Sequence, residues 1–155
     1  MWTPVWTEAA LAYLHLACVL GWVVFLTSQT ALLRPAWFNG AVVDRLVDLD
    51  RILWICWSVL LLSGLARATL GIKGAEWYWS QPLVHVKLTL LLLLGVAAWP
   101  NSRKFRAWQR RWEQDWKLPN DAEVQRVRRR VMWSAHLMLV IPLLGVALAR
   151  GLWLR

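Results

Sequence analysis

The chain has 155 residues, which is short for more than one domain, and 59% of them are hydrophobic while only 17% are charged. A soluble domain of this size would have to expose too many of these apolar side chains to water. The low charge argues against disorder, and 2 cysteines are too few for a disulfide scaffold. The 14 tryptophans indicate indole rings at a membrane–water boundary.

Two uncharged runs, 9–33 and 131–149, are each long enough to cross a bilayer, which takes a helix of roughly 20 residues. Two shorter uncharged runs become long enough to span the membrane when one is extended at its end to include Arg67 and the other at its start to include Lys87. Pro82 and Pro100 are placed as helix boundaries around the third. We therefore predict one all-α domain over residues 1–155, an integral membrane four-helix bundle. Its helices are expected at 9–33, 51–70, 82–99 and 130–153.

The segment between the third and fourth predicted helices is basic and amphipathic. Four aromatic residues recur at helical spacing between its arginines: Phe105, Trp108, Trp112 and Trp116. This pattern predicts a separate cytoplasmic loop helix, with its rings in the headgroup layer and its cations on anionic lipid. Asn120 and Asp121 offer an N-cap for the helix that follows. The basic charge is thus explained by the membrane, and no nucleic-acid partner is expected.

Ionisable side chains at membrane depth are candidates for function. His15 is predicted roughly 10 Å below the outer boundary and Lys87 roughly 8 Å below it, from the rise per residue of a helix. Arg67 and Arg150 fall near the outer ends of their own helices. Four polar groups from four helices are therefore expected at a similar depth.

Helical phase predicts where these side chains point. In the first helix one stripe is expected to face the bundle: His15, Cys18, Trp22, Phe25 and Gln29. His85 and Lys87 lie about 200° apart around the third helix, so Lys87 is assigned the interior and His85 the interface. In the fourth helix an inward stripe is predicted for His136, Val140, Leu143, Ala147 and Arg150.

An imidazole in a four-helix bundle is the usual axial ligand of b-type haem, and haem propionates need cationic partners. The sequence thus suggests His15 as the iron ligand, with Arg67, Lys87 and Arg150 binding the propionates. Structural interpretations remain open for each residue. His15 could be a hydrogen-bonded packing residue, Lys87 could reach the interface, and both arginines could anchor helix ends.

Two sets of motifs carry family resemblances. Tyr13-Leu14-His15 with Trp22, and Leu83-Val84-His85-Val86-Lys87-Leu88, resemble the HemJ-type protoporphyrinogen IX oxidases. That resemblance implies a haem protein with His15 as haem ligand and Lys87 as the essential, catalytic lysine. The run from Gly71 to Trp79, with Gln81-Pro82, Gly95, Pro100 and Ala147-Leu148-Ala149-Arg150-Gly151, is similar to an uncharacterised family of bacterial inner-membrane proteins. This family is distantly similar to HemJ and to CopD membrane proteins.

Three functions remain open at this stage. The first is a haem-binding redox protein that handles a porphyrin or electrons. The second is a non-enzymatic subunit or assembly factor of a larger inner-membrane complex, and a homo-oligomer is also open. The third is a small-molecule or ion carrier, for which Gln29 is the one polar candidate deep in the first helix.

The loop charges predict the topology of the chain. Thirteen Lys and Arg residues lie in the first loop and in the 103–130 segment, against four near the other ends of the helices. Because cytoplasmic loops carry the excess of Lys and Arg, both termini should face the periplasm of a bacterial inner membrane. A reporter enzyme fused at Arg155 should be active only as a periplasmic reporter. Activity of a cytoplasmic reporter at that position would contradict this orientation.

Overall fold

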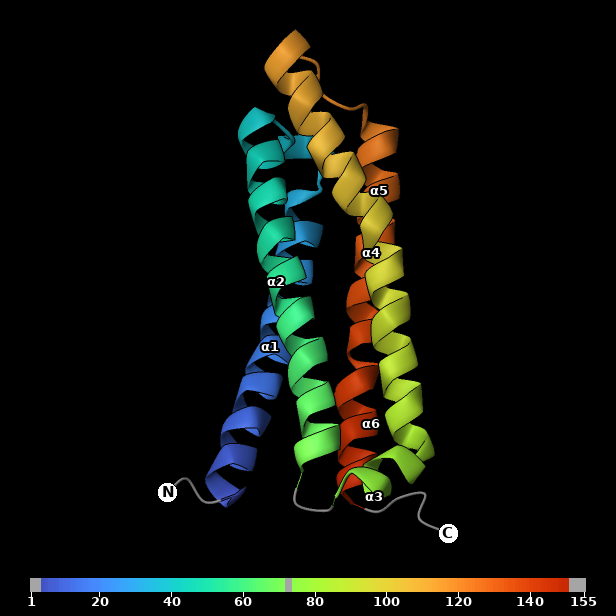
Figure 1. The fold of residues 1–155 in the computed structure, drawn as a ribbon. Helices are drawn as coiled ribbons and strands as arrows, with labels where there is room; N and C mark the ends of the chain where they lie inside the picture. The colour runs from blue at the N-terminus through green and yellow to red at the C-terminus, as the bar shows by residue number, and fades with distance from the viewer. Residues whose placement is uncertain (1–3, 72–73, 151–155) are drawn as a thin grey trace.

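The computed structural model describes residues 4–71 and 74–150, all in helices and short connections (Figure 1). The parts of the expected fourth helix and of the Gly71–Gly74 turn that fall on 151–153 and 72–73 lie outside the described residues. The elements, in chain order, are α1 (Pro4–Leu32), η1 (Pro35–Trp37), α2 (Gly40–Leu70), α3 (Ala75–Ser80), α4 (Pro82–Asp115), α5 (Asp121–Met138) and α6 (Val140–Ala149).

The long helices form one bundle in which α1 packs beside α2 and α5, while α4 packs beside α2, α5 and α6. Short α3 lies across one end, where α2 ends and α4 begins, and we call this the α3 end (Figure 1). The opposite end, which holds η1 and the connection from α4 to α5, is called the η1 end. The described part of α1 begins at the α3 end, and α6 finishes there. This is the arrangement that an even number of spans requires.

Within the described residues, four helical segments are long and apolar enough to cross a membrane: Trp6–Leu32, Gly40–Leu70, Pro82–Asp115 and Asp121–Leu148. The all-helical membrane bundle predicted from the uncharged runs is therefore confirmed. Many side chains on its outer faces are large and apolar, as lipid contact requires. The core is formed by apolar side chains from the long helices, with Trp22 and Trp108 among the fully buried residues.

The second helix begins a full eleven residues before the predicted start at residue 51. It starts at Gly40, where the Asn39 side chain caps it by accepting a hydrogen bond from the Val42 amide (3.0 Å). The prediction failed because it followed the uncharged run. The helix begins instead at a capping residue, and its charged first turns project beyond the apolar segment.

The predicted end of the third helix at Pro100 is wrong, because α4 continues through Pro100 to Asp115. The separate loop helix is accordingly absent from the described residues, and its sequence forms the last turns of α4. Phe105 and Trp108 are 0% and 1% exposed, so these two rings pack in the bundle and not among headgroups. Burying two large rings is worth roughly 1.5–3 kcal/mol each, enough to offset the hydrogen bond that proline removes.

The last span begins at the predicted cap, nine residues before the predicted helix start at residue 130, and then breaks. Asn120 Oδ1 accepts a hydrogen bond from the Glu123 amide at 2.9 Å, which confirms the N-cap. The helix is interrupted at Leu139, three residues before Pro142. Proline has no amide to donate to the Met138 carbonyl, and its ring crowds that carbonyl, which accounts for the break between α5 and α6.

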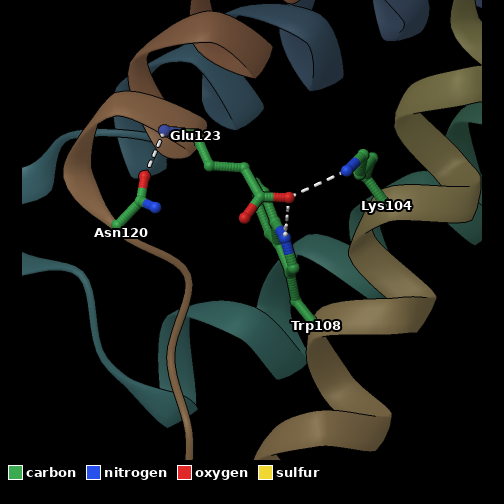
Figure 2. Close-up of polar contacts among 4 residues, drawn as sticks. All are labelled: Lys104, Trp108, Asn120 and Glu123. Atoms are coloured by element: carbon green, nitrogen blue, oxygen red, sulfur yellow. Dashed lines mark hydrogen bonds and ion pairs between the residues drawn. The ribbon is translucent and has the colours of Figure 1, made fainter.

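Glu123 joins α4 to α5 at the η1 end (Figure 2). Its Oε1 atom accepts hydrogen bonds from Lys104 Nζ at 2.9 Å and from Trp108 Nε1 at 3.1 Å. The buried indole therefore has a partner for its N–H, and the ammonium has a counter-charge. These contacts, with the Asn120 cap, fix the turn between the third and fourth spans.

The predicted inward stripe of α1 is confirmed, since Cys18, Trp22 and Gln29 are buried and the two other members are half-buried. The predicted stripe of the fourth span is wrong. His136 and Leu143 are exposed on its outer side, while Val131, Ser134 and Met138 face the bundle. The break at Leu139 also changes the helical phase from which that stripe was predicted.

Close packing of α4 on α2 gives a first test of this bundle. A Cβ atom at Gly95 would lie 2.9 Å from the Trp57 ring, whose Nε1 donates to the Leu91 carbonyl (3.1 Å) and so holds the ring in place. We expect Gly95→Ala to lower the free energy of unfolding by about 1–3 kcal/mol through overpacking. Gly145→Ala is the control, because nothing lies within 4 Å of its added Cβ. The measurement is thermal unfolding in detergent. Equal stability of the two variants would contradict this packing.

Candidate functional site

A polar contact between α1 and α2 forms the centre of the candidate site. His15 Nδ1 lies 3.0 Å from Ser63 Oγ. Gly64, the next residue along α2, allows this approach, because a Cβ atom there would lie 3.1 Å from His15 Cε1. A hydrogen bond between two transmembrane helices is worth about 1 kcal/mol, and here it also fixes the orientation of the imidazole.

The hydrogen bonds of Ser63 favour one tautomer of His15. Ser63 Oγ donates its single hydrogen to the Leu60 carbonyl at 3.2 Å. With that hydrogen used, its oxygen can accept from His15 Nδ1, which favours the tautomer of a neutral imidazole with the proton on Nδ1. Nε2 keeps its lone pair, and no hydrogen bond from the described residues occupies it. An imidazole held in this way by its other nitrogen is the form that binds a metal ion.

Two cations from α2 and α4 lie within electrostatic range of this imidazole. Arg67, one turn after Ser63, and Lys87 both act on His15, and Arg67 also acts on Lys87. All three side chains are half-buried. We call His15, Ser63, Arg67 and Lys87 the cationic cluster. The structure thus brings together three of the four predicted site residues and adds Ser63.

The guanidinium of Arg67 has an unused donor in this cluster. Its Nε atom is buried, and no group in residues 4–71 and 74–150 accepts a hydrogen bond from it. A buried donor without an acceptor costs about 1–3 kcal/mol. Because both charges that act on His15 are positive, an acceptor with negative charge would complete the cluster. The arrangement therefore suits an anionic group.

Arg150 does not join the cluster. It is exposed at the C-terminal cap of α6, and no hydrogen bond or ion pair within the described chain connects it to the other three residues. It directly follows α6, which finishes at the α3 end of the bundle (Figure 1), the end at which the sequence predicts it.

The other two histidines face away from the cluster. His85 is exposed, as predicted, and its Nε2 is 2.8 Å from the Trp79 carbonyl. His136 is exposed as well, and its Nδ1 is 2.7 Å from the Met132 carbonyl of its own helix. The inward position predicted for His136 is therefore wrong. Neither ring can supply a second nitrogen to a metal bound at His15 without moving.

A second polar cluster was missed by the sequence reasoning. Asp50 and Ser102 are buried near the η1 end, where Ser102 Oγ donates to Asp50 Oδ1 (2.7 Å) and Trp54 Nε1 donates to Ser102 Oγ (2.8 Å). The helix predicted to begin at 51 placed Asp50 outside the span. An acidic residue at the start of an apolar run, with a tryptophan one helical turn later, was the available signal.

Metal-binding groups of three or more His, Cys, Asp or Glu side chains are absent from the described residues. Cys18 and Cys56 are free thiols, although Cys56 lies close enough to α1 that its Sγ would be 3.5 Å from a Cβ at Gly21. Both thiols therefore act as small packing residues between α1 and α2, as predicted.

Four long apolar helices with buried polar contacts define a multi-pass membrane protein. A family profile described as "Predicted membrane protein (DUF2214)" matches residues 7–152. The chain therefore belongs to the DUF2214 family of membrane proteins. No curated protein and no solved structure matches the chain. The expected likeness to an uncharacterised membrane family is confirmed, while the more distant likeness to HemJ and CopD proteins stays a prediction.

Lysine substitutions on α4 test the charge environment of the cluster. Lys87→Met keeps the stem and removes a half-buried cation beside another cation, so the ligand-free protein should unfold at a temperature equal to or a few degrees above that of the wild type. Lys104→Met is the control on the same helix, since it breaks the 2.9 Å contact with Glu123 and should lower that temperature. A clear loss of stability in Lys87→Met would show that Lys87 has a stabilising partner.

Proposed function

We propose that this chain is a bacterial inner-membrane haem protein of HemJ type, with both termini in the periplasm, that acts as an oxidoreductase on a porphyrin or in electron transfer. The observation that supports this best is the cationic cluster. It presents an imidazole nitrogen with a free lone pair next to two cations and an unsatisfied buried donor. A porphyrin with a central metal and carboxylate side chains matches these groups in kind.

Each residue of the cluster fits one part of a b-type haem. His15 Nε2 would be the iron ligand, and Ser63 would orient its ring through Nδ1. Arg67 Nε and Lys87 Nζ would bind the propionates, and Arg150 would be a further cation at the same end. Haem, when bound, supplies one-electron chemistry whose potential depends on the axial ligand and on burial.

Lys87 is the residue proposed to act on the substrate. Its ammonium is half-buried, and the positive charge of Arg67 acts on it. An ammonium carries three N–H protons, any of which it can donate to a nearby acceptor. Nζ can therefore hold or pass a proton next to a ligand at the cluster, in line with the essential lysine that the HemJ resemblance implies.

Anionic lipid is the proposed partner at the η1 end. Three arginines of α5, Arg126, Arg129 and Arg130, line a groove of about 480 Å³ together with Trp133. Exposed arginines beside an exposed indole match the headgroup layer of an inner leaflet. This groove takes the place of the separate loop helix as the proposed site of lipid contact.

Histidine variants test the haem assignment. Protein made with ample haem should carry a Soret band, and His15→Ala should lose it or shift it, because the iron ligand is removed. His136→Ala is the matched control, since His136 is exposed and bonds its own helix. Absorption spectra and haem content per chain are the measurements. Haem kept in His15→Ala but lost in His136→Ala would move the site to the other end of the bundle.

Imidazole rescue separates ligand loss from misfolding. In His15→Gly, free imidazole should restore the Soret band, because it can occupy the space left by the side chain. A wild-type preparation that stays colourless with ample haem would contradict the haem proposal. It would favour the alternative of a subunit or assembly factor in a larger membrane complex or homo-oligomer.

A further inference from the structure

The second polar cluster lies in a groove between α2 and α4 that the proposed haem function does not use. The groove holds about 550 Å³, within the range of about 300–1,000 Å³ that is usual for small-molecule sites. Its polar lining comes from one carboxylate, two guanidiniums, two indoles and one hydroxyl: Asp50, Arg51, Arg106, Trp54, Trp99 and Ser58.

Asp50 has one carboxylate oxygen available to a ligand. Ser102 Oγ donates to Oδ1, while Oδ2 accepts no hydrogen bond from the described part of the chain. Arg106 acts electrostatically on Asp50 without forming an ion pair within 4 Å, since its Nε donates to the Ser102 carbonyl (3.3 Å). A buried carboxylate that keeps a free oxygen in a groove calls for a hydrogen-bond donor with positive charge.

The indoles favour the same kind of donor. Trp54 is held by its hydrogen bond to Ser102 and meets Trp99 edge to face, with ring centroids 5.9 Å apart. An ammonium beside Asp50 would lie near these rings, which attract cations through their faces. Arg51 and Arg106 line the groove with guanidinium donors that suit a phosphate.

The level of the groove indicates that lipid supplies the ligand. Asp50 lies roughly 25 Å along α2 from Arg67, close to the thickness of the hydrocarbon core, which is about 30 Å. Arg67 is at the α3 end, so Asp50 and the groove lie at the opposite headgroup layer. Trp99 is 54% exposed there, as is usual for an indole at this boundary.

We propose that this groove binds a phospholipid whose headgroup carries a primary ammonium, phosphatidylethanolamine. The ammonium donates to Asp50 Oδ2 next to Trp54 and Trp99, and the phosphate binds Arg51 and Arg106. A trimethylated ammonium has no N–H to donate, so phosphatidylcholine should bind less well. Phosphatidylglycerol has no ammonium and would leave the carboxylate without a partner.

Native mass spectrometry of the detergent-purified full chain tests this with lipids of identical acyl chains. The wild type should bind phosphatidylethanolamine about tenfold more tightly than phosphatidylcholine, the usual effect of a lost charge-assisted hydrogen bond. The mono- and dimethylated lipids keep at least one N–H and should still bind more tightly than phosphatidylcholine, so the main loss should come with the third methyl group. Asp50→Asn should abolish the preference, while Asp44→Asn, an exposed carboxylate on α2 bound to Gln109, should keep it.

Arg106→Gln provides a second variant should Asp50→Asn fail to fold. It should weaken the binding of all phospholipids while keeping the order of affinities among the headgroups. Equal binding of phosphatidylethanolamine and phosphatidylcholine by the wild type would overturn the proposal, as would tighter binding of phosphatidylglycerol. Soluble glycerophosphoethanolamine that competes as well as the lipid would overturn the lipid source.

Discussion

A polar side chain inside a bilayer can find its partner only in the protein, because lipid tails offer no hydrogen bonds. In this bundle such side chains join neighbouring helices. His15 meets Ser63 between α1 and α2, and Trp57 donates to the Leu91 carbonyl between α2 and α4. Since α2 takes part in both contacts, it orients α1 and α4 with respect to each other. The cationic cluster exists because these three helices meet at one level.

The two ends of the bundle differ in charge at the level of the headgroups. At the α3 end, the charges that act on His15 are both positive, and a buried donor of Arg67 has no acceptor among the described residues. Near the η1 end, the buried charge is the carboxylate of Asp50, which Ser102 holds. The cationic cluster is therefore suited to an anionic group, and the groove beside Asp50 to a ligand that carries both charges. The two sites share α2 and α4 but no residue.

The sequence was a good guide wherever hydrophobic pattern and helical phase decide the outcome. The number of spans, the stripe through Trp22 and the opposite faces of His85 and Lys87 follow from these alone. It was a poor guide at helix ends. A helix continues through turns rich in charged residues when the apolar side chains of those turns pack in the core. Trp108 lies in such a turn, and its burial extends α4 beyond Pro100. The partner of His15 could not be read from the chain, since a serine on the next helix gives no periodic signal.

The central claim is that His15 alone, of the three histidines, faces a site for haem. His85 and His136 bind backbone carbonyls on the outside of the bundle. Electron paramagnetic resonance of the haem-loaded wild-type protein reads the axial ligands directly. The account predicts a ferric spectrum typical of one histidine ligand, and His15→Ala should abolish that spectrum. A spectrum with two histidine ligands would contradict it.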